Sequence, residues 1–118
     1  MTTMRSVKVA ELLKNEISQI LRFRMKDPRV GFVTITNIVL SDDLRQAKVY
    51  YTIIGDEKQK KDSQIGLEHA HSFIQKELGS RLQLRYTPVL RFYYDEGLEY
   101  EMRINRILEE LNLGEQST

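Results

Sequence analysis

Apolar residues recur at helical spacing between residues 5 and 25. Their intervals of four, four, three and one residue place them on one face of an α-helix. The helix should stop near Pro28, because the proline ring fixes φ and disfavours helical geometry in the preceding residue. The pattern therefore predicts a first helix whose apolar face consists of Val9, Leu13, Ile17, Ile20 and Leu21.

An alternating pattern follows, which is typical of β-strands. Residues 30–40 are rich in β-branched side chains and predict a strand with Val33, Ile35 and Val39 on one face and Thr34, Thr36 and Ile38 on the other. Residues 41–45, Ser-Asp-Asp-Leu-Arg, favour a turn. A second strand then pairs with the first as a hairpin, and its apolar face consists of Ala47, Val49, Tyr51 and Ile53.

The second half of the chain predicts a loop, a helix and a strand. Residues 55–63 are polar and mixed in charge, so we expect a solvated loop. Helical spacing returns over residues 64–84, although Gly79 weakens the helix by about 1 kcal/mol relative to Ala. The apolar face of this helix consists of Leu67, Ala70, Ile74, Leu78 and Leu82, widened by Phe73. Thr87-Pro88 opens a third strand over residues 89–95, with Leu90, Phe92 and Tyr94 on one side.

The order α-β-β-α-β, followed by a helix over residues 98–111, predicts an α+β fold with helices on one face of a three-stranded mixed sheet. If the second and third strands are neighbours, their helical link makes them parallel through a right-handed crossover. This order fits the type II K-homology fold, whose usual G-x-x-G loop is absent here. We expect a K-homology-like RNA-binding domain over residues 1–96 and an acidic C-terminal helix and tail over residues 97–118.

Charge is distributed unevenly along the chain. Residues 1–94 carry 16 Lys and Arg against 10 Asp and Glu, a net of +6, whereas residues 95–118 carry 2 against 7, a net of −5. A basic body with an acidic end is typical of a protein that meets a polyanion, although ordinary solvated helix faces give the same bias. The chain has no cysteine and no long apolar run, so we expect a cytoplasmic protein without disulfides or membrane spans.

Candidate catalytic chemistry is sparse. The two histidines, His69 and His71, are two residues apart and point in different directions on a helix, so they predict no metal site. The carboxylate pairs 42–43 and 95–96 suit turn capping at least as well as acid–base work. A small hydrolase or nuclease stays open as an alternative, but it needs clustered carboxylates or histidines in one pocket. We expect a protein that binds without catalysis and without a cofactor.

Five segments together resemble the ribosome-binding factor A family: K-D-P-R, G-F-V-T-I-T-N-I-V-L, S-D-D-L-R-Q-A-K-V-Y-Y, A-H-S-F-I-Q-K-E-L and L-R-Y-T-P-V-L-R-F-Y-Y-D. The resemblance covers about residues 5–108. It implies a K-homology-like domain that binds the free small (30S) ribosomal subunit and its 16S rRNA, and promotes late maturation and 5′-end processing of that RNA. It also implies a monomer, with an assembly GTPase as a further candidate partner.

The resemblance further implies a kink in the second helix. The family replaces G-x-x-G with an Ala-x-Gly kink, and the matching positions here are Ala70, His71 and Ser72. Ser stands where the family has Gly and costs less helix propensity, so the bend is either gentler or held by Ser72 bonding back to a carbonyl.

Cations that can meet phosphates lie near the first helix end, on the hairpin and along the second helical region. They are Arg22, Arg24, Lys26, Arg29, Arg45, Lys48, Lys76, Arg81 and Arg85. Solubility and helix-end electrostatics are the alternative explanation for them. Strand aromatics are expected in the core, and Tyr86 beside Arg85 is the leading exception. A protein-interaction module is a further alternative, using the C-terminal apolar residues Ile104, Ile107, Leu108 and Leu111.

Overall fold

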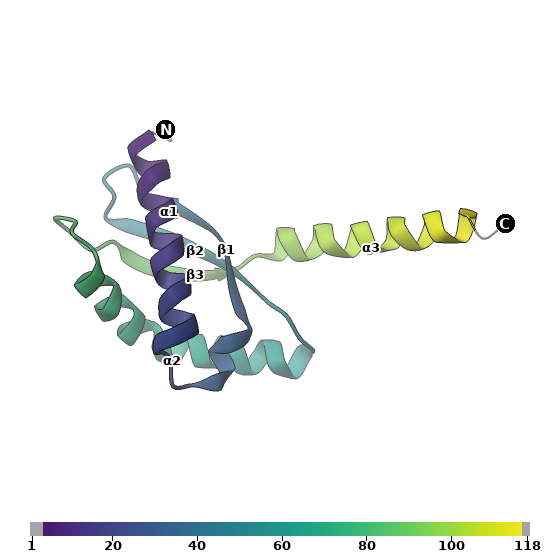
Figure 1. The fold of residues 1–118 in the computed structure, drawn as a ribbon, viewed down its shortest axis with the longest axis horizontal. Coiled ribbons are helices and arrows are strands. Elements are labelled where there is room, and N and C mark those ends of the chain that lie inside the picture. The colour runs from purple at the N-terminus through teal and green to yellow at the C-terminus, as the bar shows by residue number, and fades with distance from the viewer. Residues whose placement is uncertain (1–3, 117–118) are drawn as a thin grey trace.

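The computed structural model describes residues 4–116, and describes side chains at all of these except 98, 99 and 113–116. In chain order its main elements are helix α1 (Met4–Gln19), strands β1 (Val33–Leu40) and β2 (Gln46–Ile53), helix α2 (Glu57–Arg81), strand β3 (Val89–Tyr94) and helix α3 (Glu96–Gln116). Helices α1 and α2 lie on the same side of the sheet, and α3 extends away from it (Figure 1). The predicted α+β class is confirmed.

The three strands form one mixed sheet in the order β1-β2-β3. Strand β1 pairs with β2 in antiparallel fashion, and β2 pairs with β3 in parallel, as predicted for strands linked by a helix. The inward face of β2 is buried at all four predicted positions, 47, 49, 51 and 53. These side chains meet the apolar stripes of α1 and α2, where Leu13, Ile17, Ile74 and Leu78 are fully buried.

The predicted faces of β1 are wrong beyond residue 35. The register of the β1–β2 pairing shifts between Ile35 and Asn37, so Thr36 is the extra residue of a β-bulge. A bulge moves the following side chains to the opposite face of the strand. Ile38 is therefore buried and Val39 is 48% exposed, the reverse of the prediction. Strict alternation cannot reveal an inserted residue.

The connection between α1 and β1 is also more structured than predicted. After Gln19 the helix widens into a π-helical turn over Ile20–Arg24, and Met25 is already extended. Pro28 then opens a short 3₁₀ helix, Pro28–Phe32, capped by the side chain of Asp27. Strand β1 consequently begins at Val33 instead of Val30. Val30, within the 3₁₀ helix, is buried and belongs to the core.

Helix α2 begins earlier than predicted, at Glu57, because residues 56–59 form a capping box. The Asp56 carboxylate accepts from the Gln59 amide at 2.8 Å, and the Gln59 side chain accepts from the Asp56 amide at 2.8 Å. The expected loop over residues 55–63 is therefore mostly helix. Ser63 is fully buried, and its hydroxyl donates to the Arg29 carbonyl at 2.8 Å.

Two residues assigned to the apolar face of α2 do not behave as predicted. The helix passes through Gly79 and ends at Arg81, so Leu82 lies just beyond it in extended conformation. Phe73 is 41% exposed instead of widening the buried stripe. Gly66 is buried where α2 crosses the 3₁₀ segment, and a Cβ there would lie 3.1 Å from Cβ of Arg29. The helix packs closely at that point because the residue lacks a side chain.

Helix α3 starts at Glu96, two residues before the predicted start, and continues to Gln116. Tyr100, Ile107, Leu108 and Leu111 are all between 46% and 63% exposed. The helix therefore contributes little to the core. None of the helices in the described part of the chain is long and apolar enough to cross a membrane.

Candidate nucleic-acid interface

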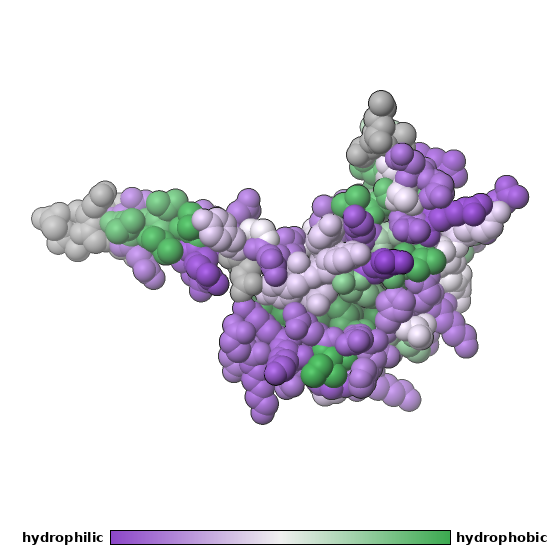
Figure 2. Space-filling model, turned by 180° about the vertical axis from the view of Figure 1, so that it is seen from behind, coloured by the Kyte–Doolittle hydropathy of each residue, from purple (hydrophilic) through white to green (hydrophobic). Residues whose placement is uncertain are grey.

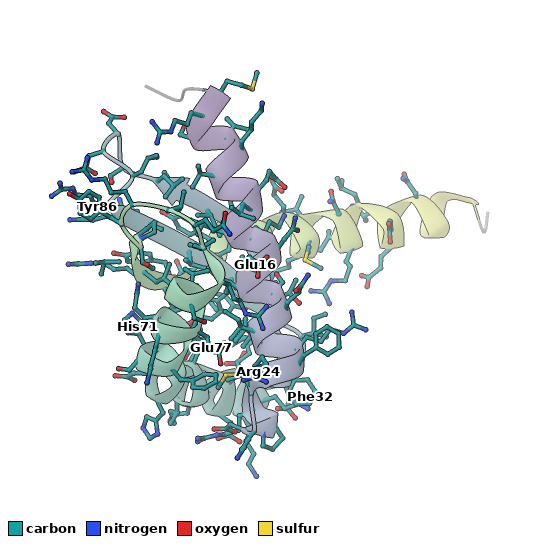
Figure 3. The ribbon with its side chains drawn as sticks, turned by 60° about the vertical axis from the view of Figure 1, so that its left-hand side comes forward. Glu16, Arg24, Phe32, His71, Glu77 and Tyr86 are labelled. Carbon is teal, nitrogen blue, oxygen red and sulfur yellow. The ribbon has the colours of Figure 1, made fainter. Side chains whose placement is uncertain are left out.

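The predicted cations fall into two regions of the described structure. One lies where the end of α1 meets α2, and the other lies at the hairpin end of the sheet. Figure 3 shows Arg24 near the lower end of α1 and Tyr86 at the opposite end of the body. Arg22, Arg24, Lys26, Lys48, Lys76 and Arg85 are exposed, as is Arg45.

At the α1 end, two of the arginines form a network with carboxylates on both helices. Arg24 donates to the Glu77 carboxylate at 3.1 Å, and Arg81 lies 3.2 Å from Glu16 and 3.7 Å from Glu77. These groups line the seam between α1 and α2 (Figure 3). Arg81 and its two carboxylates have side chains only 19–26% exposed. The network therefore holds the two helices together, which sequence spacing did not indicate.

Arg29 is engaged by a carboxylate of its own. Its guanidinium donates to Oδ2 of Asp27 at 2.9 and 2.6 Å and to Oδ1 at 3.0 Å, and its backbone N–H donates to Oδ1 at 3.0 Å. These donors hold the pKa of the Asp27 carboxyl below its ordinary value, and the same pairing raises the pKa of Arg29. Arg29 thus closes the turn between α1 and β1, and its charge is offset locally.

A groove of about 670 Å³ runs between the end of α1 and the middle of α2. Its floor contains Ala70 and Gly66, and two exposed aromatic rings, Phe23 and Phe73, stand beside it. Arg24 and Lys26 also line it. The groove combines apolar surface with cations, which is a suitable chemistry for a nucleic acid or an acidic peptide.

At the hairpin end, two arginines lie over one aromatic ring. The guanidinium carbons of Arg45 and Arg85 lie 4.7 and 5.4 Å from the ring centre of Tyr86. Tyr86 is 50% exposed. The exposure agrees with the expectation that Tyr86 is the exception among the aromatics, and its ring lies beneath two guanidinium groups. The turn carboxylate of Asp43 accepts from Ser41 Oγ at 2.6 Å and from the Arg45 amide at 3.0 Å, which lowers its pKa.

The predicted kink residues lie in an unbroken helix. Helix α2 is continuous through Ala70, His71 and Ser72, although its first and second halves run in different directions in Figure 1. Ala70 is buried and Ser72 is exposed. A kink centred on these three residues stays a prediction.

His71 and Gln75 have a role that the sequence did not reveal. The His71 Nε2–H donates to the Leu90 carbonyl at 2.7 Å, and the Gln75 amide bonds both the Pro88 carbonyl at 2.7 Å and the Leu90 amide at 2.9 Å. The two side chains therefore satisfy backbone groups on the outer edge of β3 and protect it from pairing with another strand. Among the described residues, no group of three or more carboxylates and histidines is arranged to hold a metal ion.

Comparison with known proteins assigns the family. The family model for ribosome-binding factor A matches residues 5–108. Two relatives with that name are similar over most of their length. The one from Natranaerobius thermophilus is 48% identical over 99% of this chain and 89% of its own. The one from Staphylococcus saprophyticus is 49% identical over 92% of this chain and 96% of its own.

Solved structures of similar shape carry the same name. The solution structure of a Thermotoga maritima protein assigned to this factor gives a TM-score of 0.68 at 28% identity, covering 82% of this chain and 92% of that one. A homology model of the Thermus thermophilus factor, fitted into a cryo-EM map of its 30S complex, gives 0.56 at 22% identity, with coverage of 79% and 93%. The second likeness concerns the fold alone. By sequence and by structure, this chain belongs to the ribosome-binding factor A family.

Proposed function

We propose that this chain binds the free small ribosomal subunit through its 16S rRNA, in the cytoplasm, and promotes late maturation of that RNA, including 5′-end processing. The observation that carries the proposal is the family match over residues 5–108, which spans the whole basic body. The Thermus thermophilus relative is described in complex with the 30S subunit, which supports the same partner here.

The proposed contacts are electrostatic and directed at phosphates. Two exposed cations lie at the α1 end: Lys26 lines the groove with apolar walls, and Arg22 lines a separate hollow between α1 and β1. Displacement of counterions from RNA gives an affinity that falls steeply with salt. The remaining proposed contacts are Arg24, Arg29, Arg45, Lys48, Lys76, Arg81 and Arg85. Arg24, Arg29 and Arg81 already have carboxylate partners, so we rank them below the others.

The proposed mechanism needs neither covalent chemistry nor a cofactor. A bound factor shifts an RNA equilibrium by the difference between its affinities for the two conformations. By binding one arrangement of the assembling particle more tightly, this protein would raise its population and let processing proceed. The chain would then leave when the mature arrangement no longer offers the same contacts.

Sedimentation with separated ribosomal particles tests the proposal. We expect comigration with the free small particle at low salt, loss of comigration at high salt, and none with the large or joined particles. Comigration with no particle, or equally with all of them, would contradict it. Primer extension on RNA from cells depleted of the protein should show 5′-extended precursors of the small-subunit RNA.

Charge reversal identifies the surface. Arg22→Glu with Lys26→Glu should abolish comigration and leave urea unfolding unchanged, because both side chains are exposed. Arg24 is kept, since its loss would also break the pair with Glu77. A matched control reverses the exposed cations of α3, Arg103→Glu with Arg106→Glu, which should bind normally. Retained binding by the first variant would place the interface elsewhere.

Helix α3 has a second proposed role, as a docking element for a protein partner. Its exposed residues Tyr100, Ile107, Leu108 and Leu111 lie at helical spacing along an arm that extends from the body (Figure 1). An assembly GTPase is the candidate partner, and the chain itself is proposed to be monomeric. Truncation after Asp95 separates the two roles, because it should remove partner binding and retain small-subunit binding by residues 1–95.

A further inference from the structure

The outer face of the sheet carries a second, distinct surface. Helices α1 and α2 cover the other face, so the side chains that alternate with the core residues of β2 and β3 point outward. Figure 2 views the molecule from the side opposite to that of Figure 1, in which α1 lies in front of the sheet. Side chains of intermediate hydropathy lie across its middle, with hydrophilic ones around them (Figure 2).

Two tyrosines form a pair at the centre of this face. Tyr50 and Tyr93 are direct partners on β2 and β3, and their ring centres lie 5.8 Å apart at an interplanar angle of 33°. Tyr93 is 40% exposed and stands on an edge strand, so no further strand covers the side of its ring away from Tyr50. An aromatic ring exposed in this way can stack on a nucleobase of any type.

Two cations form the adjacent row. Lys48 and Arg91 are direct partners on the same strands, two residues before the tyrosines, and both are exposed. Like charges directly opposite each other on a sheet face destabilise the pairing. Both side chains point away from the core and so do not contribute to its packing. A bound phosphate would offset their mutual repulsion. The sheet therefore places a phosphate-binding row beside a base-stacking pair, about 6.5–7 Å away along the strands, which is the rise of two residues.

The end of the sheet continues the same chemistry. Arg45, which precedes β2, accepts the Val89 amide on its carbonyl at 2.8 Å and places its guanidinium over Tyr86. Arg85 lies over the same ring. The acidic turn residues Asp42 and Asp43 also lie near Arg85, so they border the cationic surface at this end.

We propose that this outer face binds an unpaired segment of RNA, with bases on the Tyr50–Tyr93 pair and phosphates along Lys48 and Arg91. The inference rests on the proposed function, because it takes rRNA as the natural source of that segment. It concerns residues different from the α1-end cations and selects single strands over duplex. A duplex keeps its bases stacked on each other and cannot offer them to a flat aromatic surface.

Binding of a 10-nucleotide oligoadenylate with a central 2-aminopurine tests the proposal on the full chain. We expect quenching of 2-aminopurine fluorescence on binding, and much weaker binding of the same strand in duplex with oligouridylate. Tyr93→Leu should abolish the quenching and weaken binding at least about fivefold, because a fivefold loss is the lower end of what one stacked base contributes. Tyr93→Phe retains the ring and should keep both the affinity and the quenching of the wild type. Tyr100→Leu, an exposed tyrosine on α3, is the matched control.

The cations give an independent readout. Arg91→Ala and Lys48→Ala should each lower the slope of log affinity against log salt by about 0.7, the value for one phosphate contact of a single strand, while quenching at saturation persists. These variants decide the question if Tyr93→Leu fails to fold. Wild-type affinity and quenching in a folded Tyr93→Leu, unchanged salt slopes, or equal binding of duplex would overturn the proposal.

Sedimentation separates this proposal from the proposed function. If wild-type protein comigrates with the small particle but Tyr93→Leu binds the oligonucleotide normally, the outer face is not the RNA surface and the proposed function stands. Tyrosine-dependent oligonucleotide binding without comigration would contradict the proposed function alone. If Tyr93→Leu loses comigration but not oligonucleotide affinity, the face docks a protein of the particle, and its assignment to RNA is wrong.

Discussion

The seam between α1 and α2 and the outer face of the sheet use the same cationic residue types in different ways. At the seam between α1 and α2, Arg24 pairs with Glu77, and Arg81, which is about three-quarters buried, pairs with both Glu16 and Glu77. On the outer sheet, Lys48 and Arg91 face solvent beside two tyrosines. An arginine near a predicted binding surface can therefore act as a clamp, a cation that holds two helices together by pairing with their carboxylates. The presence or absence of carboxylate partners shows whether such an arginine is structural or available to a ligand.

The largest effect on stability is expected from breaking the clamp. Arg81→Met keeps the aliphatic contact but leaves Glu16 and Glu77 together without their shared cation. Losing a hydrogen-bonded partner at a partly buried carboxylate should lower the free energy of unfolding by about 1–3 kcal/mol, toward the lower end here because water still reaches these groups. Urea unfolding followed by circular dichroism measures the change.

The control for this variant is Lys76→Met on the same helix. Lys76 is exposed, and substitutions at such sites usually change stability by less than about 0.5 kcal/mol. Equal stability of the two variants would mean that the clamp contributes nothing and that Arg81 is available to RNA.

A second effect concerns the salt dependence of small-subunit binding. Lys26→Ala should reduce the slope of log affinity against log salt by about 0.7–0.9, because one phosphate contact is lost. Arg29→Gln removes the charge that a phosphate would meet. Because the Asp27 carboxylate offsets that charge, the slope should match the wild type. A reduced slope for Arg29→Gln would place Arg29 among the phosphate contacts.

The regular elements of the fold could be predicted from the sequence, but several local irregularities could not. Helical and alternating spacing predicted α1, β2 and β3, because each buries one regular stripe, and the helical link between β2 and β3 predicted their parallel pairing. The bulge at Thr36, the π-helical turn after Gln19 and the 3₁₀ helix at Pro28 break the period locally. The Asp27 side chain caps the 3₁₀ helix and Thr36 donates to the Asp95 carboxylate at 2.7 Å, and spacing along the chain reveals neither contact. The start of α2 was readable in principle, since Asp56 and Gln59 have the spacing of a capping box.

The candidate site, too, could be predicted from the sequence only in part. Spacing identified the basic residues but not their partners, which come from elements 53 and 65 residues away in the chain. The expectation that strand aromatics lie in the core is wrong for Tyr93, which is 40% exposed on the outer face, and its ring pair with Tyr50 depends on the β2–β3 register. Family resemblance supplied the partner class, and only the fold showed which cations remain exposed to it.

The smallest effect expected is a pH dependence at the turn that Arg29 closes. Arg29 lowers the pKa of Asp27 in the folded protein below its ordinary value of 3.8. A carboxyl with a depressed folded pKa stabilises the fold above its unfolded pKa, and that contribution is lost as the pH falls through the folded pKa. Asp27→Asn keeps an oxygen that can accept the Arg29 backbone amide but cannot titrate. Relative to wild type, it should be less stable at pH 7, and the gap should shrink below about pH 4. Thermal melts at pH 7, 4 and 3 measure this, and a gap independent of pH would show that the Asp27–Arg29 pair does not contribute through its charge.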